Sequence, residues 1–149
     1  MNAVAEEGLL SPEMEKAGVL GHDDASKRRP GDVTIPSWSA GKGLAIDVAV
    51  ICPTNKSNLK VPHPANYYAE VVKHRKYDIG FSGSGYNFVA LVIECSGGYG
   101  DEAEGLLSQL FRFAAKVDGS RYCDYASKAW ARVACNVQQS VAQQILDRS

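Results

Sequence analysis

Hydrophobic and polar positions along this chain follow two periods, and the changes between them predict where strands and helices lie. Short β-rich apolar runs predict strands over 32–35, 44–51 and 88–95. Apolar residues at three- and four-residue steps predict helices over 65–77, 102–116 and 122–146. The stripe of the last helix that should face the core consists of Trp130, Val133, Val137, Val141 and Ile145.

The segments between these elements read as turns, loops or linkers. The run 36–43 is rich in Ser and Gly, and the run 52–64 contains three prolines and no periodicity, so both predict loops. Residues 1–29 are expected to form a short helix over Pro12–Val19, capped by Ser11, followed by a polar linker. Residues 30–149 are then expected to form a single domain.

The order of the predicted elements defines a fold class. It runs α-β-β-α-β-α-α, which is typical of an α/β or α+β domain with a small mixed β-sheet flanked by helices. The helix between the second and third strands permits a right-handed parallel crossover.

Composition narrows the function classes. A net charge of −1 provides no global basic field, so any contact with nucleic acid must be local. The longest apolar run, FVALVI, is too short to span a bilayer, and the acidic N-terminus does not resemble a signal peptide. We therefore expect no membrane association and no secretion, with a nuclear or cytoplasmic location.

The cysteines at 52, 95, 123 and 135 are irregularly spaced and form no CxxC motif. Without a secretion signal, reduced and mostly buried thiols are favoured over disulfides. The histidines lack the spacing of a zinc finger, so a zinc site is not favoured.

Asp32 and Asp47 each lie in an apolar strand, where a carboxylate is costly to bury without a partner. Asp32 follows Pro-Gly, and taken alone it would be interpreted as satisfying turn amides. Asp47 is more informative, because strand alternation places it on one face with the small residues Ala45 and Ala49 and with Ile51. Such an acid is paired, protonated or bound to a metal ion.

Further candidates follow along the chain. Lys73 and Lys76 lie on the helix over 65–77, where an isolated lysine is ordinarily only solvated. Glu94 ends the buried strand and could either add a metal ligand or cap the following SGGYG turn. The SGGYGDE stretch predicts a tight strand-to-helix connection with acidic residues at the helix start rather than a phosphate loop.

Three blocks of the chain carry a resemblance to a known family: RRPGDVTIPSWSAGKGLAIDVAVICP, AEVVKHRKY and FVALVIECSGGYGDEA. Their order and spacing resemble the restriction-endonuclease-like domain, of the PD-(D/E)xK superfamily, found at the C-terminal end of retrotransposon polyproteins. The resemblance covers about residues 12–116. It implies a restriction-endonuclease-like fold, a Mg²⁺- or Mn²⁺-dependent DNA endonuclease activity, and a reverse transcriptase domain of the parent element as a possible partner.

The resemblance also implies roles for individual residues. Asp32 and Asp47 would be catalytic acids that hold the metal, with Lys73 as the catalytic lysine that orients or deprotonates the attacking water. The choice between Lys73 and Lys76 stays open. Glu15 would be a third metal ligand, and the residues that contact DNA would be Arg29, Arg75, Lys76 and Tyr77. The alternative is a catalytically inactive remnant of a transposon that serves as a binding or assembly module.

Overall fold

The computed structural model describes residues 10–14 and 31–148. The strands are β1 (Glu13–Met14), β2 (Val33–Ser39), β3 (Lys42–Ile51) and β4 (Tyr86–Glu94), and the helices are α2 (Pro64–Tyr67), the π-helix η2 (Tyr68–His74), α3 (Arg75–Phe81), α4 (Asp101–Asp118) and α5 (Tyr122–Leu146). The strands form one sheet in the order β1-β2-β3-β4, with β3 and β4 parallel and the other neighbours antiparallel. The prediction of a mixed α and β fold with a small mixed sheet between helices is confirmed.

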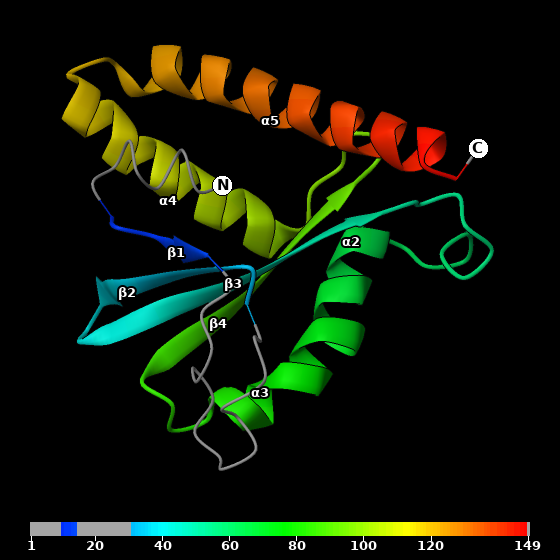
Figure 1. Ribbon diagram of the computed structural model, residues 1–149, viewed down its shortest axis with the longest axis horizontal. Coiled ribbons are helices and arrows are strands. Elements are labelled where there is room, and N and C mark those ends of the chain that lie inside the picture. The colour runs from blue at the N-terminus through cyan, green and yellow to red at the C-terminus, as the bar shows by residue number, and fades with distance from the viewer. Residues whose placement is uncertain (1–9, 15–30, 149) are drawn as a thin grey trace.

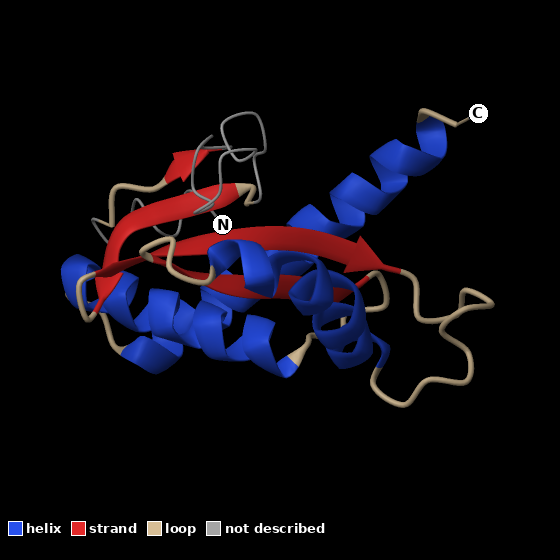
Figure 2. Ribbon diagram, turned by 90° about the horizontal axis from the view of Figure 1, so that it is seen from below, coloured by secondary structure: helices blue, strands red, loops and turns tan. Residues whose placement is uncertain are grey.

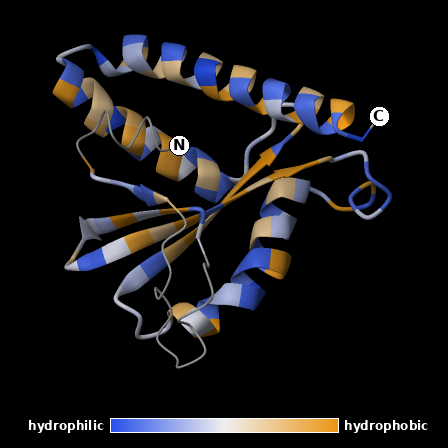
Figure 3. Cartoon of the chain, in the orientation of Figure 1, coloured by the Kyte–Doolittle hydropathy of each residue, from blue (hydrophilic) through white to orange (hydrophobic). Residues whose placement is uncertain are grey.

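The two faces of the sheet are covered by different helices (Figure 1). On one face, Leu44, Ile46 and Leu91 pack with buried residues of α4 and α5. On the other face, Ile51 and Val92 pack against α2 and η2. Hydrophobic colour concentrates on the central strands in Figure 3, and the far end of α5 extends past the sheet in Figure 2. Asp47 therefore lies in a central strand between two helical layers.

The β2–β3 hairpin is longer than the pattern predicts. Most of the expected loop at 36–43 is strand, and Ser39 pairs with Lys42 across a two-residue turn. Ala40 and Gly41 in that turn have φ of 48° and 73°, the left-handed backbone that a tight hairpin turn requires. A register shift between Ile35 and Ser39 accommodates Pro36, which has no N–H to donate to the sheet. The loop prediction was wrong because pairing with β3 overrides the local turn signal.

The predicted helix over 65–77 is present but has an unexpected centre. A single helical segment runs from Pro64 to Phe81, and its middle, η2, is a π-helix rather than an α-helix. π-Helical turns are rare and occur frequently at functional sites. Lys73 lies within η2.

The start of the chain contradicts the predicted N-terminal helix. Glu13 and Met14 form the edge strand β1, in antiparallel register with Val33 and Thr34. The rest of the predicted helix, 15–19, lies outside the described residues. A short exposed segment can pair with an open sheet edge regardless of its helical pattern.

The two C-terminal helices agree with the prediction to within two residues at each end. Val137 of the predicted stripe is buried in the core, whereas Ile145 is 63% exposed where α5 runs past the sheet. Among the described residues, none of the helices has the length and apolar character needed to cross a bilayer.

The prediction of mostly buried cysteines was wrong. All four thiols are free, but Cys52, Cys123 and Cys135 are exposed and Cys95 is half-buried. Cys135 lies on the side of α5 away from its buried residues, and Cys123 lies in the first turn of the helix, where its side chain is exposed.

Candidate active site

Asp47 is one of two buried polar side chains in the described core, at 8% exposure. Its face of β3 continues through Ala45, which packs with Phe81, and through Ile51, which packs with α2 and η2. Ala90 is its parallel neighbour on β4. The small side chains around Asp47 therefore leave space above it, as the alternation in the sequence predicts.

Lys73 fills that space from η2. Its Nζ forms an ion pair with Oδ2 of Asp47, and the lysine side chain is only 17% exposed. Among the described residues, this oxygen of Asp47 has no hydrogen-bond partner apart from the lysine ammonium. The helix following β3 thus delivers a cation directly to the buried acid.

The electrostatics of Lys73 favour its charged form. Burial lowers the pKa of the Lys73 ammonium. The hydrogen bond and the negative charge of Asp47 raise that pKa by a larger amount, so the net shift is upward. The hydroxyl groups of Tyr68 and Tyr77 act in the same direction. Lys73 is therefore protonated at neutral pH and is suited to stabilising negative charge.

Asp32 lies across the β2–β3 pair from Asp47. Val33 pairs with Ile46 in antiparallel register. Asp32 and Asp47 are each one position beyond this pair, so they lie opposite each other on neighbouring strands. Oδ2 of Asp32 accepts a hydrogen bond of 2.7 Å from the backbone N–H of Val48, in the peptide bond that joins Asp47 to Val48. Asp32 is exposed while Asp47 is buried, so the pair offers one solvated and one desolvated carboxylate.

These two carboxylates have the chemistry of a magnesium site. Mg²⁺ prefers oxygen ligands and is commonly bound by one or two carboxylates together with water. Within 10–14 and 31–148, no group of three or more His, Cys, Asp or Glu side chains gathers as a set of metal ligands. The predicted third ligand, Glu15, lies outside the described residues. The fit therefore rests on Asp32, Asp47 and solvent.

The predicted DNA contacts divide into exposed and packed side chains. Arg75 and Lys76 are exposed on α3, and Nζ of Lys76 lies 4.8 Å from the ring centre of Tyr77. Tyr77 is half-buried and packs on Phe88 with ring centres 5.3 Å apart. Its ring therefore supports the core, and Arg29 lies outside the described residues. Of the two candidate lysines, the structure brings Lys73 to Asp47 and leaves Lys76 on the surface.

Glu94 acts as a cap and does not reach Asp47. One of its carboxylate oxygens accepts the N–H of Ala65 at 3.3 Å and the other accepts the hydroxyl of Ser96 at 3.4 Å. It ties the end of β4 to the start of α2 and to the SGGYG turn. Of the two readings left open by the sequence, the structure supports the cap.

The start of α4 is also capped from α2. The N–H of Asp101 donates to Oδ1 of Asn66 at 2.7 Å. The acidic first turn follows as predicted, with Asp101, Glu102 and Glu104 near the positive end of the helix dipole.

His74 links the helix over 64–81 to α4, a role that the sequence reasoning missed. Its Nε2 contacts Oε2 of Glu102 at 2.9 Å, and its Nδ1 contacts Oδ1 of Asp78 at 2.7 Å. Glu102 also accepts the N–H of Ala90 on the outer edge of β4 at 3.2 Å. The spacing of His74 and Asp78 by four residues was the available signal, but the third partner comes from α4.

The His74 bridge predicts a pH-dependent stability. Burial lowers the pKa of His74, but its hydrogen bonds to Glu102 and Asp78 raise it more, so the net pKa is raised. The stabilisation is thus fully present below about pH 6.5 and is lost as the pH rises through the folded-state pKa. The expected gain of wild type over His74→Gln is at most about 1 kcal/mol, because both acids are partly solvated. Urea unfolding at several pH values measures it, and a gain that does not decline with pH would contradict this role.

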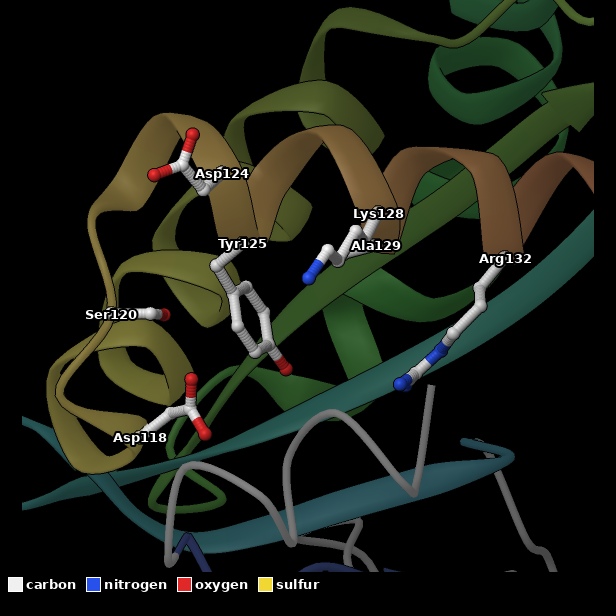
Figure 4. A pocket seen from close by; sticks show the side chains of 7 residues that line it. All are labelled: Asp118, Ser120, Asp124, Tyr125, Lys128, Ala129 and Arg132. Atoms are coloured by element: carbon white, nitrogen blue, oxygen red, sulfur yellow. The ribbon is translucent and has the colours of Figure 1, made fainter.

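A separate hollow lies between the end of α4 and α5 (Figure 4). It is lined by Asp118, Ser120, Asp124, Tyr125, Lys128, Ala129 and Arg132. These residues belong to α4, α5 and the turn between them, which cover the opposite face of the sheet from Asp47. The hollow is therefore not part of the carboxylate and lysine site.

Comparison with protein-family models, curated proteins and solved structures finds no match to this chain.

Proposed function

We propose that this chain is a Mg²⁺-dependent DNA endonuclease domain of retrotransposon origin with a restriction-endonuclease-like fold. The proposal rests on the resemblance of its sequence blocks and on one structural observation. Lys73 reaches the buried Asp47 from the following helix, while the carboxylate of Asp32 bonds to the peptide that follows Asp47. Lys73 thus contacts Asp47 directly, and Asp32 contacts the neighbouring backbone, although the three residues are distant in sequence.

The proposed chemistry is hydrolysis of a phosphodiester bond. A divalent cation, when bound, supplies Lewis acidity and lowers the pKa of a coordinated water. Asp47 and Asp32 would hold that cation through the carboxylate oxygens that Lys73 and the Val48 N–H do not occupy. Lys73, charged at neutral pH, would stabilise the negative charge that develops on the phosphate and orient the attacking water.

The proposed DNA contact lies on the exposed side of α3. Arg75 and Lys76 lie two and three positions after Lys73 along the helical segment and are both exposed. Cationic side chains beside a hydrolytic site can neutralise neighbouring phosphates of the backbone. This local patch would compensate for the near-neutral charge of the whole chain.

Nicking of supercoiled plasmid tests the function. The wild type is expected to nick in Mg²⁺ or Mn²⁺ and to stop when the cation is chelated. Lys73→Ala should abolish nicking, while its matched control Lys76→Ala should weaken DNA binding and lower its salt dependence. Metal-independent nicking, or no nicking by a folded wild type, would overturn the proposal and favour the inactive binding module.

A further inference from the structure

The parallel pairing of β3 and β4 brings two cysteines together just beyond the strand ends. Cys52 follows the last residue of β3 and Cys95 follows the last residue of β4. Ile51 and Glu94 are register partners, and the N–H of Cys95 donates to the carbonyl of Ile51 at 2.8 Å. The parallel register thus continues one step, and the two thiols lie close enough for each to shift the pKa of the other.

The spacing of these residues suits a covalent bond between them. Neighbouring strands lie about 4.8 Å apart, within the range of roughly 4.4–6.8 Å that disulfides span between Cα atoms. Both cysteines lie one residue beyond the strand ends, and the disulfide needs their Cβ atoms to approach to about 4 Å. Cys52 is exposed and Cys95 is half-buried, so a small oxidant can reach the pair.

The surroundings make the two thiols unequal. The hydroxyl of Thr54 lies 3.2 Å from Sγ of Cys52, and together with the Thr54 N–H and the Cys95 thiol it lowers the pKa of Cys52. Burial raises the pKa of Cys95, and the neighbouring Cys52 raises it further. Cys52 is therefore suited to attack first, as a thiolate, and Cys95 is suited to react with the oxidised Cys52 afterwards.

We propose that Cys52 and Cys95 form a hydroperoxide-sensitive dithiol that closes into a reversible disulfide. The Cys52 sulfur attacks the O–O bond of a hydroperoxide, becoming a sulfenic acid while one water or alcohol leaves. The Cys95 sulfur then attacks the sulfenic sulfur, the S–S bond forms, and the second oxygen leaves as water. The two thiols give up two electrons in total, and the hydroperoxide is reduced.

The bond would fix the base of the loop between β3 and α2. The carbonyl of Cys52 accepts hydrogen bonds from the N–H of Asn55 at 3.3 Å and from Nδ2 of Asn58 at 2.8 Å. On the other side, the carbonyl of Cys95 accepts Nε2 of Gln138 on α5 at 2.9 Å. A disulfide would thereby link the loop that leads to α2 to β4 and α5. This site does not depend on the proposed nuclease activity.

Peptide mapping after peroxide treatment tests the proposal directly. Tryptic cleavage places each cysteine on its own peptide: 43–56, 77–112, 122–128 and 133–148. The folded wild type is treated with hydrogen peroxide, blocked with a thiol reagent and digested. It should yield peptides 43–56 and 77–112 as one linked product, whose mass is two hydrogens less than the sum of the two free peptides. Dithiothreitol should separate them.

Two sets of variants control the experiment. Cys52→Ser and Cys95→Ser should each lose the linked product, with Cys95→Ser accumulating a sulfenic acid on Cys52 that dimedone traps. The double variant Cys123→Ser/Cys135→Ser should retain it, since these thiols lie apart on α5. The proposal is overturned if the folded wild type gives only intermolecular links, or sulfinic acid on Cys52 without the 43–56 to 77–112 link.

Discussion

Replacing Asp47 with alanine is expected to lower the rate of DNA cleavage at least about a hundredfold, the loss expected when a contact worth about 3 kcal/mol in the transition state is removed. The physical reason is that Asp47 is both a proposed cation ligand and the counter-ion of Lys73. Without it, burial still lowers the pKa of the Lys73 ammonium while the main opposing interaction is gone, so that pKa falls from the raised value. Single-turnover cleavage of a labelled duplex measures the rate.

Asp47→Ala should also destabilise the fold, by up to about 3 kcal/mol, since it leaves a half-buried ammonium without a partner. Asp47→Asn separates the two effects, because it preserves the size of the side chain and removes its charge. Both variants should lose cleavage, and Asp47→Asn should remain folded by circular dichroism. If either folded variant cleaves at the wild-type rate, Asp47 is not a catalytic acid.

Phe111→Ala should cause the largest loss of stability among single core substitutions, about 3–5 kcal/mol. Phe111 is fully buried in α4 and packs edge-on against Trp130 of α5 with ring centres 5.1 Å apart. Its removal leaves a cavity between the α4–α5 layer and the sheet, which the surrounding side chains cannot fill completely. Urea unfolding followed by tryptophan fluorescence reports the change.

Phe113→Ala is the matched control, with the same chemistry two residues along the same helix. Phe113 is 43% exposed and meets Trp38 at 5.7 Å between ring centres. Its loss should cost less than about 1.5 kcal/mol, because much of the ring already lies in water. Equal losses at the two positions would mean that α4 does not pack on the sheet through Phe111.

The periodic parts of the fold could be predicted because local sequence and tertiary packing agree there. The stripe of α5 packs on the core as far as Val141 and leaves Ile145 exposed, and the apolar run of β4 is buried over 90–93. The ends of the two strands in the hairpin over 33–51 could not be predicted from the sequence, because the strands continue through Pro36 and Gly43 only by pairing with each other. The edge strand β1 likewise depends on an open sheet edge that a local pattern does not reveal.

The candidate site was predictable at Asp47 and less so at its partner. The small residues at 45 and 49 indicated space beside the acid, and the structure fills that space with Lys73. The sequence left Lys73 and Lys76 as alternatives because both lie on one helix. Lys73 lies in the π-helix η2, and Lys76 lies beyond it. The spacing of apolar residues does not indicate this π-helical geometry.

The thiol pair and the His74 bridge were missed for a common reason. Cys52 and Cys95 are 43 positions apart, and only the parallel register of β3 and β4 makes them neighbours. His74 and Glu102 meet because α4 begins at the outer edge of β4. Contacts of this kind depend on how the elements pair and not on the pattern within any one of them.

We propose that Asp32 and Asp47 together hold a divalent cation, and the loss of the free-ion electron paramagnetic resonance signal of Mn²⁺ measures that binding. The wild type should bind Mn²⁺, and Asp32→Asn and Asp47→Asn should each weaken that binding by about tenfold or more. Asp118→Asn changes an exposed acid on α4 and should bind Mn²⁺ as the wild type does. Equal binding by all four proteins, or none by the wild type, would mean that Asp32 and Asp47 do not form a cation site.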